Sequence, residues 1–309
     1  MAKDLYPNYS LEEIIEGMET SDKKRLALQN YPTDGVIVRA DLPYLDDGDD
    51  FHKFDIYYNE ERKGDPIPTI INIHGGGLVY GTKELDKNMN VDFAREGFNV
   101  LGLNYRLIPR VNLREQISDI ISALNFIFRN HNDLGLSLEK TFISADSAGC
   151  YLAMAAFAVI NSPKLQDLFD LKGPEIKING MVFISPMTKL EGEGSISTIN
   201  DLVVNALDKK EQKAYAKNMI PILYEVEVCP ILIQTSSEDF IRDHSYDLRN
   251  YLDKRGAFYE FIDFGKGRDY ELGHVFPVCY PKYPESLMAI EQMVLFLISC
   301  KIKCDTRIK

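Results

Sequence analysis

The stretch TFISADSAG, residues 141–149, runs directly into the segment CYLAMA, residues 150–155. Its first five residues suit a short buried strand, whereas the alanine-rich segment after Gly149 suits a helix. Ser147 stands between small residues at the junction, and no loop sequence separates the two elements. The stretch therefore predicts a tight strand-to-helix turn, which is typical of a parallel α/β sheet.

The rest of the chain repeats this alternation. Short apolar, β-branched runs recur at 36–40, 54–58, 68–74, 99–104, 141–145, 178–184, 230–235 and 258–262. Segments with helical periodicity lie between or after the later runs, at 113–128, 147–160, 244–254 and 285–300. The pattern predicts an α/β fold with a mostly parallel, eight-stranded sheet and helices on both faces. Only the acidic stretch 46–50 separates the first two runs, so these are expected to form an antiparallel hairpin.

Two regions interrupt the alternation. Residues 1–30 form a charged amphipathic segment before the first strand, and residues 187–227 turn polar, with helical patterns around 202–206 and 215–220. We expect both to be additions to a core that consists of residues 31–186 and 228–309.

Composition limits the class of protein. The 309 residues are 45% hydrophobic and 27% charged, as in an ordinary soluble globular protein. The formal net charge of −12 disfavours a nucleic-acid partner. The longest nearly apolar run, 151–160, is about half of what spans a bilayer, and the N-terminus shows no secretory signal. Five cysteines without a regular framework favour reduced thiols in the cytoplasm.

No metal site is expected. Cys300 and Cys304 lie one helical turn apart, but no histidine or second cysteine pair stands near them. The acidic run 46–50 lacks the pattern of a calcium-binding loop and is expected to be a solvated hairpin tip.

The turn at Ser147 matches a nucleophile elbow, which projects a serine hydroxyl at the carboxyl edge of a sheet. The usual pattern is G-x-S-x-G, and here Ala145 replaces its first glycine. A second motif, His74-Gly75-Gly76-Gly77, follows an apolar strand, and its glycines leave backbone N–H groups free to converge on one point. Together the motifs predict a serine nucleophile that faces an oxyanion hole made by the N–H groups of Gly76, Gly77 and Ala148.

These residues resemble the hormone-sensitive-lipase-like branch of the α/β-hydrolase superfamily, which contains bacterial esterases. The likeness rests on HGGG at 74–77, NYRLIP at 104–109, DSAG at 146–149, and Asp239 with His274. The second segment is similar to the family's D-Y-R-L-A-P, and Asp119 falls where the family has an aspartate on the following helix. The departures from the family pattern are Asn104 for Asp, Arg110 for Glu, Leu78 for an aromatic residue, and Ala145 for Gly.

The resemblance implies an α/β-hydrolase fold, a Ser-His-Asp triad without a cofactor, and a helical cap. The cap would consist of residues 1–30 and 187–227 and would limit the size of the substrate. Leu78 and Asp146, which adjoin the two motifs, are expected to bind the substrate.

The triad base and acid should follow Ser147 in the chain. Of the two later histidines, His274 is favoured because it lies in a loop between the last strand and the last helix. His244 starts a helix and is expected to be exposed.

For the acid, the segment SEDFIRD, residues 237–243, is similar to the family's D-P-L-x-D signature, whose first aspartate maps onto Asp239. Asp243 would then cap the following helix. Glu238 and Asp243 remain alternatives for the triad acid.

The expected activity is hydrolysis of small, short-acyl carboxylic esters through an acyl-enzyme. Amide cleavage on the same scaffold, as in arylformamidases, is one alternative. A non-catalytic small-molecule receptor is another, as in the gibberellin receptors that resemble this family, but the presence of His274 argues against it. The resemblance also allows a homodimer through the last strand.

Overall fold

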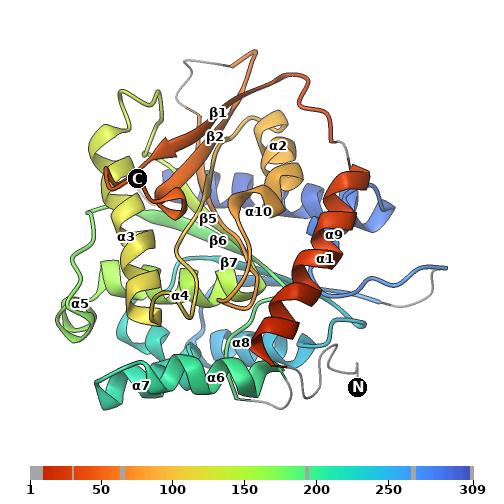
Figure 1. Ribbon diagram of the computed structural model, residues 1–309. Coiled ribbons are helices and arrows are strands. Elements are labelled where there is room, and N and C mark those ends of the chain that lie inside the picture. The colour runs from red at the N-terminus through yellow and green to blue at the C-terminus, as the bar shows by residue number, and fades with distance from the viewer. Residues whose placement is uncertain (1–9, 30, 63–66, 192–194, 266–268, 307–309) are drawn as a thin grey trace.

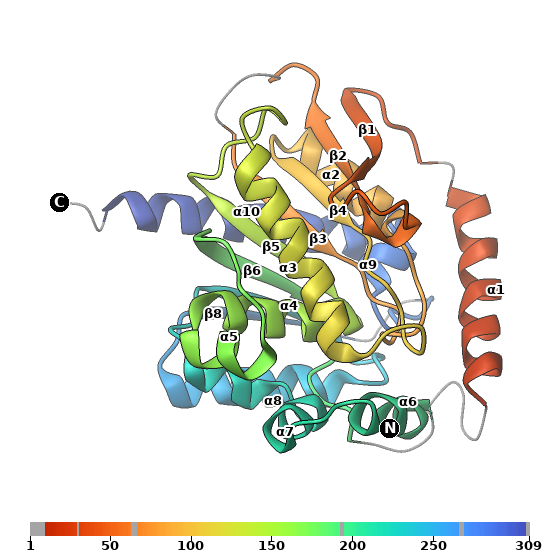
Figure 2. The same ribbon diagram turned by 60° about the vertical axis from the view of Figure 1, so that its left-hand side comes forward.

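The computed structural model describes residues 10–29, 31–62, 67–191, 195–265 and 269–306. It contains all eight expected strands: β1 (Val36–Pro43), β2 (Lys53–Asn59), β3 (Thr69–Ile73), β4 (Asn99–Leu103), β5 (Thr141–Asp146), β6 (Ile178–Ile184), β7 (Ile231–Ser236) and β8 (Tyr259–Phe264). They form one sheet in the order β1-β2-β4-β3-β5-β6-β7-β8, whose strands can be followed in Figures 1 and 2 together. β2 is antiparallel to both β1 and β4, and the other neighbours are parallel. The expected fold class and the N-terminal hairpin are therefore confirmed.

The helices are α1 (Leu11–Gln29), α2 (Lys87–Arg95), α3 (Leu113–Asn130), α4 (Ser147–Asn161), α5 (Pro163–Phe169), α6 (Ser195–Asn205), α7 (Lys210–Lys217), α8 (Arg242–Arg255), α9 (Phe276–Cys279) and α10 (Pro284–Thr306). Short 3-10 turns occur at Asp50–His52, Lys83–Asp86 and Ile220–Glu225. The four helices of the core that the periodicity predicts are present. Within 187–227 the helices begin earlier than predicted, and the second predicted segment ends in a 3-10 turn rather than a helix.

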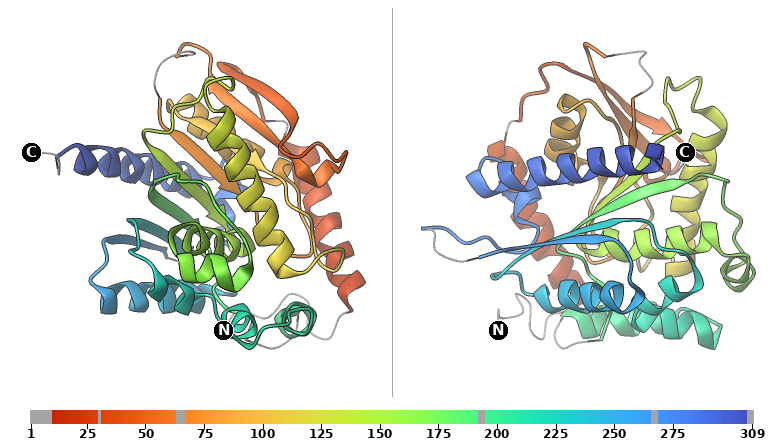
Figure 3. Two further views of the ribbon diagram at one scale, coloured as in Figure 1. Left: turned by 90° about the vertical axis from the view of Figure 1, so that its left-hand side faces the viewer. Right: turned by 180° about the vertical axis from the view of Figure 1, so that it is seen from behind.

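Two apolar clusters lie on opposite faces of the sheet. The side chains of β3 alternate between them, since Ile71 and Ile73 belong to one cluster and Ile70 to the other. Helices α3, α4 and α8 cover the first face, and α2 and α10 cover the second (Figures 2 and 3). Both faces of the central strands are thus buried, as a parallel sheet requires.

Local sequence signals define the helix ends. Before α3, the Asn112 side chain accepts from the N–H of Glu115 at 3.0 Å, and the Glu115 carboxylate accepts from the N–H of Asn112 at 2.8 Å. This reciprocal pair satisfies two N–H groups that the first turn leaves free. At the far end of α8, Gly256 adopts a φ of 60° and ends the helix.

The two regions outside the alternation pack near one another. α1 runs along one side of the molecule and contacts α6, which in turn contacts α7 (Figure 2). The Tyr151 hydroxyl of α4 donates to the Ala216 carbonyl of α7 at 2.5 Å and joins this region to the core. Residues 1–9, 30 and 192–194 of the expected cap lie outside the described residues. Among the described helices, none combines the length and the apolar character that a membrane span needs.

Candidate active site

Ser147 lies where β5 passes into α4, and its backbone has a φ of 46°. Non-glycine residues adopt this left-handed conformation only where the surroundings hold them in it. Close packing enforces the turn, because a Cβ atom on Gly149 would lie 2.0 Å from the Ile73 carbonyl oxygen of β3. Ala145, which replaces the usual glycine, is accommodated with no exposed surface.

A continuous hydrogen-bond chain joins three of the predicted residues. The Ser147 Oγ lies 2.8 Å from the His274 Nε2, and the His274 Nδ1 lies 2.8 Å from the Asp239 Oδ1. Because a carboxylate can only accept, Nδ1 carries the imidazole proton and Nε2 is left to accept from the serine hydroxyl. Ser147 follows β5, Asp239 follows β7 and His274 follows β8. Because these strands are parallel, all three residues lie at the edge of the sheet where the strands end.

Several groups hold Asp239 in place. The Thr235 hydroxyl donates to its Oδ2 at 3.1 Å, and the N–H of Ile241 donates to its Oδ1 at 3.0 Å. Burial raises the pKa of Asp239, but the charge and hydrogen bond of His274 and donation from Ser185 and Ile241 outweigh burial, so the pKa is lowered. Asp239 is therefore an ionised carboxylate at neutral pH.

The loop that carries His274 is fixed on both sides. The Phe240 ring lies 4.6 Å from the imidazole, between ring centroids. Val275 has a φ of 49°, and its N–H donates to the Ser185 hydroxyl at 3.1 Å. The imidazole is thus held in one orientation before any substrate arrives.

Glu238 and Asp243, the two alternatives for the triad acid, form no hydrogen bond with His274 among the described residues. Glu238 accepts from the N–H of Leu272 at 2.7 Å, so its carboxylate holds the histidine loop rather than the histidine. Asp243 is exposed in the first turn of α8, whose N-cap is Ile241 without a side-chain cap. The expectation that Asp243 caps this helix was therefore wrong.

His244 is buried, contrary to the expectation of an exposed residue. The N–H of Thr188 donates to its Nδ1 at 3.1 Å, and burial lowers the pKa of His244 to about 4. A signal for this was available, because His244, Leu248 and Tyr251 are spaced i, i+4, i+7 and share the apolar face of α8.

The glycine motif forms a tight turn beside Ser147. Gly76 and Gly77 have φ values of 103° and 62°, and a Cβ on Gly76 would lie 2.0 Å from the Tyr80 carbonyl oxygen. Within the part of the chain that the structure describes, neither Gly76 nor Gly77 donates its N–H to an acceptor. The N–H of Ala148 lies in the first turn of α4, where the helix itself supplies no acceptor.

The histidine of the glycine motif supports this turn. His74 is fully buried and stacks on Tyr105 at 4.4 Å between ring centroids. Its Nδ1 donates to the Gly75 carbonyl at 2.8 Å, and the Tyr105 hydroxyl donates to the His74 carbonyl at 2.8 Å. Burial lowers the pKa of His74 to about 4, so this imidazole is neutral at pH 7.

Leu78 and Asp146, the two residues expected to bind the substrate, are both buried in the structure. Leu78 has no exposed surface, and its carbonyl accepts from the N–H of Ile108 at 3.0 Å. Asp146 is 5% exposed, and its Oδ1 accepts from the N–H of Gly75 at 2.6 Å. Each residue therefore has a hydrogen bond to the backbone, and substrate binding by either one stays a prediction.

The remaining family positions each form a polar contact within the protein. Arg106 donates to Asp119 through its backbone N–H, Nε and Nη2 at 3.0, 2.8 and 2.6 Å. Asn104 accepts from the N–H of Lys83 at 2.7 Å. Arg110 pairs with Asp49 of the acidic hairpin tip.

The described residues contain no group of three His, Cys, Asp or Glu side chains arranged to hold a metal ion. Side chains of residues 301–306, including that of Cys304, lie outside the description.

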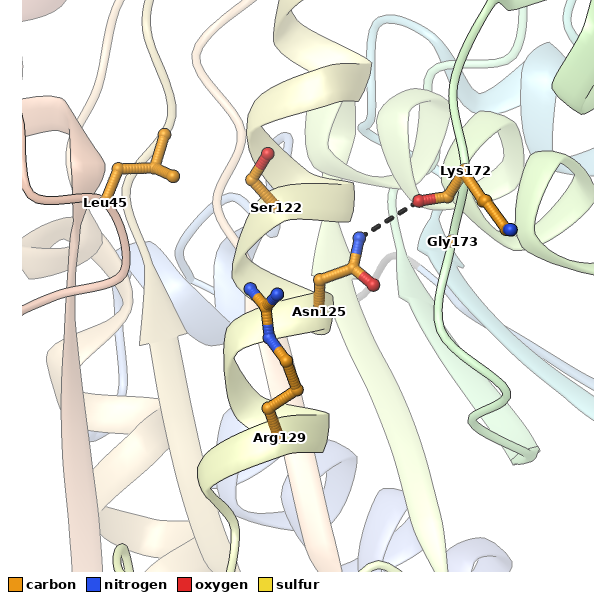
Figure 4. A pocket seen from close by; sticks show the side chains of 6 residues that line it. All are labelled: Leu45, Ser122, Asn125, Arg129, Lys172 and Gly173. Carbon is orange, nitrogen blue, oxygen red and sulfur yellow. Dashed lines mark hydrogen bonds between the residues drawn. The ribbon is translucent and has the colours of Figure 1, made fainter.

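Two hollows lie away from Ser147. One, of about 280 Å³, lies beside α3 and is lined by Leu45, Ser122, Asn125, Arg129, Lys172 and Gly173 (Figure 4). Its wall is joined by a hydrogen bond from Asn125 to the Lys172 carbonyl at 3.0 Å. The other, of about 630 Å³, lies between α1 and the segment 279–283. Neither includes Ser147, Asp239 or His274.

The sheet order and the serine turn after β5 define an α/β-hydrolase fold. Solved structures agree: esterase B of Lactobacillus rhamnosis superimposes with a TM-score of 0.89 at 24% identity, covering 96% of each chain. An esterase of Mycobacterium marinum gives 0.74 at 17% identity, covering 96% of this chain and 92% of that one. The chain belongs to the BD-FAE family, whose sequence model matches residues 54–252.

Curated relatives match over shorter ranges. Lipase 2 of a Moraxella species is 24% identical over 230 residues, which are 64% of this chain and 53% of that protein. An acetyl esterase of Salmonella paratyphi B is 28% identical over 89 residues, 28% of each chain. The match thus spans about half of the Moraxella relative and less of the other.

Proposed function

We propose that the protein is a serine carboxylic-ester hydrolase with Ser147, His274 and Asp239 as its catalytic triad. The observation that carries this proposal is the hydrogen-bond chain from the serine hydroxyl through the imidazole to the buried carboxylate. The names of the relatives, which include a lipase and an acetyl esterase, support an ester as the substrate class.

In this mechanism His274 takes the proton of Ser147 as the hydroxyl attacks the ester carbonyl. Asp239 keeps Nδ1 protonated and offsets the positive charge that the imidazole gains. His274 then gives the proton to the departing alcohol, and water, activated by the same base, hydrolyses the acyl-enzyme.

The oxyanion would be met by the N–H groups of Gly76, Gly77 and Ala148. Their lack of other acceptors within the described residues supports this role. Each such donor typically contributes about 3 kcal/mol to stabilising the transition state.

We further propose that residues 1–30 and 187–227 act as a cap that restricts the acyl group to short chains. A Cβ placed on Gly77 would lie 3.4 Å from the Ile199 Cδ1 of α6 and 3.7 Å from the Met18 Cε of α1. Apolar side chains from both cap regions thus lie next to the glycine turn, which supports a cap that bounds the acyl site. A tributyrin phosphonate inhibits esterase B of Lactobacillus rhamnosis, so butyrate esters are a suitable first probe.

The test is a panel of p-nitrophenyl esters from acetate to dodecanoate with one N-acyl anilide, combined with fluorophosphonate labelling. We expect turnover of acetate or butyrate, labelling at Ser147, and loss of both in Ser147→Ala. Ser122→Ala, which alters a serine on α3 away from the triad, is the matched control and should behave as wild type. A folded protein that neither cleaves the short esters nor takes up the probe would refute the proposal, and faster anilide cleavage would assign the enzyme to amides.

We also propose a homodimer through β8. This strand pairs only with β7 among the described strands, so its outer edge is open. Leu295 and Ile298 of α10 are exposed apolar side chains. Light scattering at micromolar concentration should give twice the monomer mass, and a monomer at all concentrations would refute this arrangement.

A further inference from the structure

A cavity outside the catalytic site lies between α1 and the segment 279–283. Its volume is about 630 Å³, and neither the triad residues nor the glycine turn lines it. Small-molecule sites in proteins typically have volumes of about 300–1,000 Å³, so this cavity is large enough for a ligand. The proposed mechanism uses none of its lining residues. The chemistry of its walls therefore indicates what else the protein could bind.

The first wall of the cavity is one face of α1. Gly17, Thr20, Ser21 and Lys24 line it and follow the i, i+3, i+4, i+7 spacing of a single helical face. Gly17 lies in the interior of α1, where only proline is less favourable to a helix than glycine. No turn or helix end at this position calls for a glycine. Its missing side chain instead leaves the cavity wide at this point.

The opposite wall is aromatic. Tyr280 and Tyr283 both line the cavity, and their rings stack with centroids 4.9 Å apart and planes 9° apart. On its other contact, the Tyr283 ring lies 4.1 Å from that of Tyr270. The Tyr280 side chain is nevertheless 45% exposed, so much of its surface is open to another ring. Flat aromatic groups stack on such rings in an offset arrangement.

An ion pair at the cavity joins the two walls. The Arg25 Nε donates to the Asp22 Oδ1 at 2.8 Å, and the Arg25 Nη1 donates to the Val278 carbonyl at 3.2 Å. The Arg25 side chain is only 11% exposed, so this pair is largely shielded from water. Asp22 is the one carboxylate among the described lining residues, and Arg25 neutralises its charge.

Two further cations face each other across the cavity. Lys24 lies on α1 and Lys282 on the opposite segment, and both are exposed. Within the described residues neither forms an ion pair. The cavity thus carries an excess of positive charge in a chain whose formal net charge is −12. The hydroxyl groups of Thr20 and Ser21 add hydrogen-bond donors on the same helical face. Ammonium and hydroxyl donors of this kind bind a carboxylate.

We propose that this cavity is a second binding site, for a planar aromatic carboxylate. The ring of the ligand would stack on Tyr280, and its carboxylate would lie between Lys24 and Lys282. The bound molecule would connect α1 of the cap to the segment that follows α9, and α9 itself begins two residues after His274. This site is separate from the ester-binding site of the proposed mechanism.

The first test is isothermal titration calorimetry of the full chain with sodium 2-naphthoate as the probe. We expect one site with a Kd on the order of tens of micromolar. The uncharged isostere 2-naphthamide should bind at least about tenfold more weakly, because it cannot pair with the two lysines. Sodium chloride at about 0.5 M should weaken the binding of naphthoate, because both lysines are exposed to solvent.

Substitutions locate the bound probe. Lys24→Ala and Lys282→Ala should each raise the Kd about fivefold, as expected for a solvent-exposed ion pair. Lys23→Ala is the matched control, since Lys23 is the exposed neighbour of Lys24 on α1 and does not line the cavity. Gly17→Leu should abolish binding by filling the cavity. Its control is Ala27→Leu, which adds the same side chain at an exposed position of α1 outside the lining.

Three results would overturn the proposal. They are no saturable binding below about 1 mM, equal affinity for 2-naphthamide, and undiminished binding in Gly17→Leu, which would place the probe elsewhere, such as at Ser147. Circular dichroism confirms that each variant is folded. The titration needs no catalysis, so its failure leaves the ester hydrolase standing, and a protein that cleaves no ester can still show the site.

Discussion

Replacing Asp239 by Asn tests the acid of the triad. The hydrogen bonds around this side chain determine how the new amide group is oriented. The Oδ1 accepts from both His274 and the N–H of Ile241, whereas the Oδ2 accepts from the Thr235 hydroxyl. The amide oxygen should therefore take the Oδ1 position and the NH₂ group should donate to the Thr235 hydroxyl, which can also accept. The imidazole tautomer is then preserved, and the substitution removes the charge alone.

The magnitude follows from the geometry. With Nδ1 and Oδ1 at 2.8 Å, the centres of the imidazolium and carboxylate charges lie about 4 Å apart, which corresponds to about 4 kcal/mol at an effective dielectric constant near 20. Because about 1.4 kcal/mol corresponds to a factor of ten, kcat/KM should fall about 10³-fold in Asp239→Asn. Asp239→Ala should fall further, since it also releases the imidazole.

The assay is kcat/KM on p-nitrophenyl butyrate together with the rate of fluorophosphonate labelling, with circular dichroism to confirm the fold. Glu238→Gln is the control, because its side chain can still accept from the N–H of Leu272 and makes no contact with His274. It should change kcat/KM by less than about threefold. A loss below tenfold in Asp239→Asn, or an equal loss in Glu238→Gln, would refute the assignment of the acid.

Three further predictions concern stability and are measured by denaturant unfolding. Asp119→Ala should lower the free energy of unfolding by about 3 kcal/mol because it leaves the partly buried Arg106 unpaired. Asp170→Asn, at a surface pair with 90% of the carboxylate side chain exposed, should have no measurable effect, because asparagine tolerates the φ of 51° at this position. Equal effects of the two substitutions would contradict the argument. His244 has a pKa lowered from 6.5 to about 4 by burial, so below pH 6.5 the unfolded chain binds the extra proton and the wild type loses up to about 3 kcal/mol by pH 4. His244→Asn should remove that part of the acid loss, and an unchanged pH slope would show that the imidazole is not neutral in the native state. Gly149→Ala should destabilise by about 3 kcal/mol or more, since its Cβ would meet a backbone carbonyl at 2.0 Å, and a neutral result would refute the tightness of the serine turn.

Much of the fold could be predicted because its signals are local. A strand buried on both faces reads as a short apolar run, and each of the eight runs became a strand with ends shifted by a few residues. The positions of Ser147 and His274 followed from the same alternation, since the chain order places each at a strand-to-helix connection. The helices α2, α5 and α9 escaped prediction because they are short and their stability depends on packing rather than on their own periodicity.

The groups behind the site could not be predicted for a different reason. Asp146 reads as an ordinary polar residue at the start of a helix, yet β3 and β5 are neighbours and bring its Oδ1 to the N–H of Gly75, which donates to it at 2.6 Å. Nothing in the local sequence specifies this hydrogen bond, because it joins the residue before Ser147 to a turn 71 residues earlier in the chain. The same holds for the surroundings of Leu78, whose side chain is buried and whose carbonyl accepts from the Gln116 side chain of α3 at 2.9 Å. Sequence motifs therefore identify the groups that would react, whereas the groups that keep them aligned become visible only when distant strands are placed side by side.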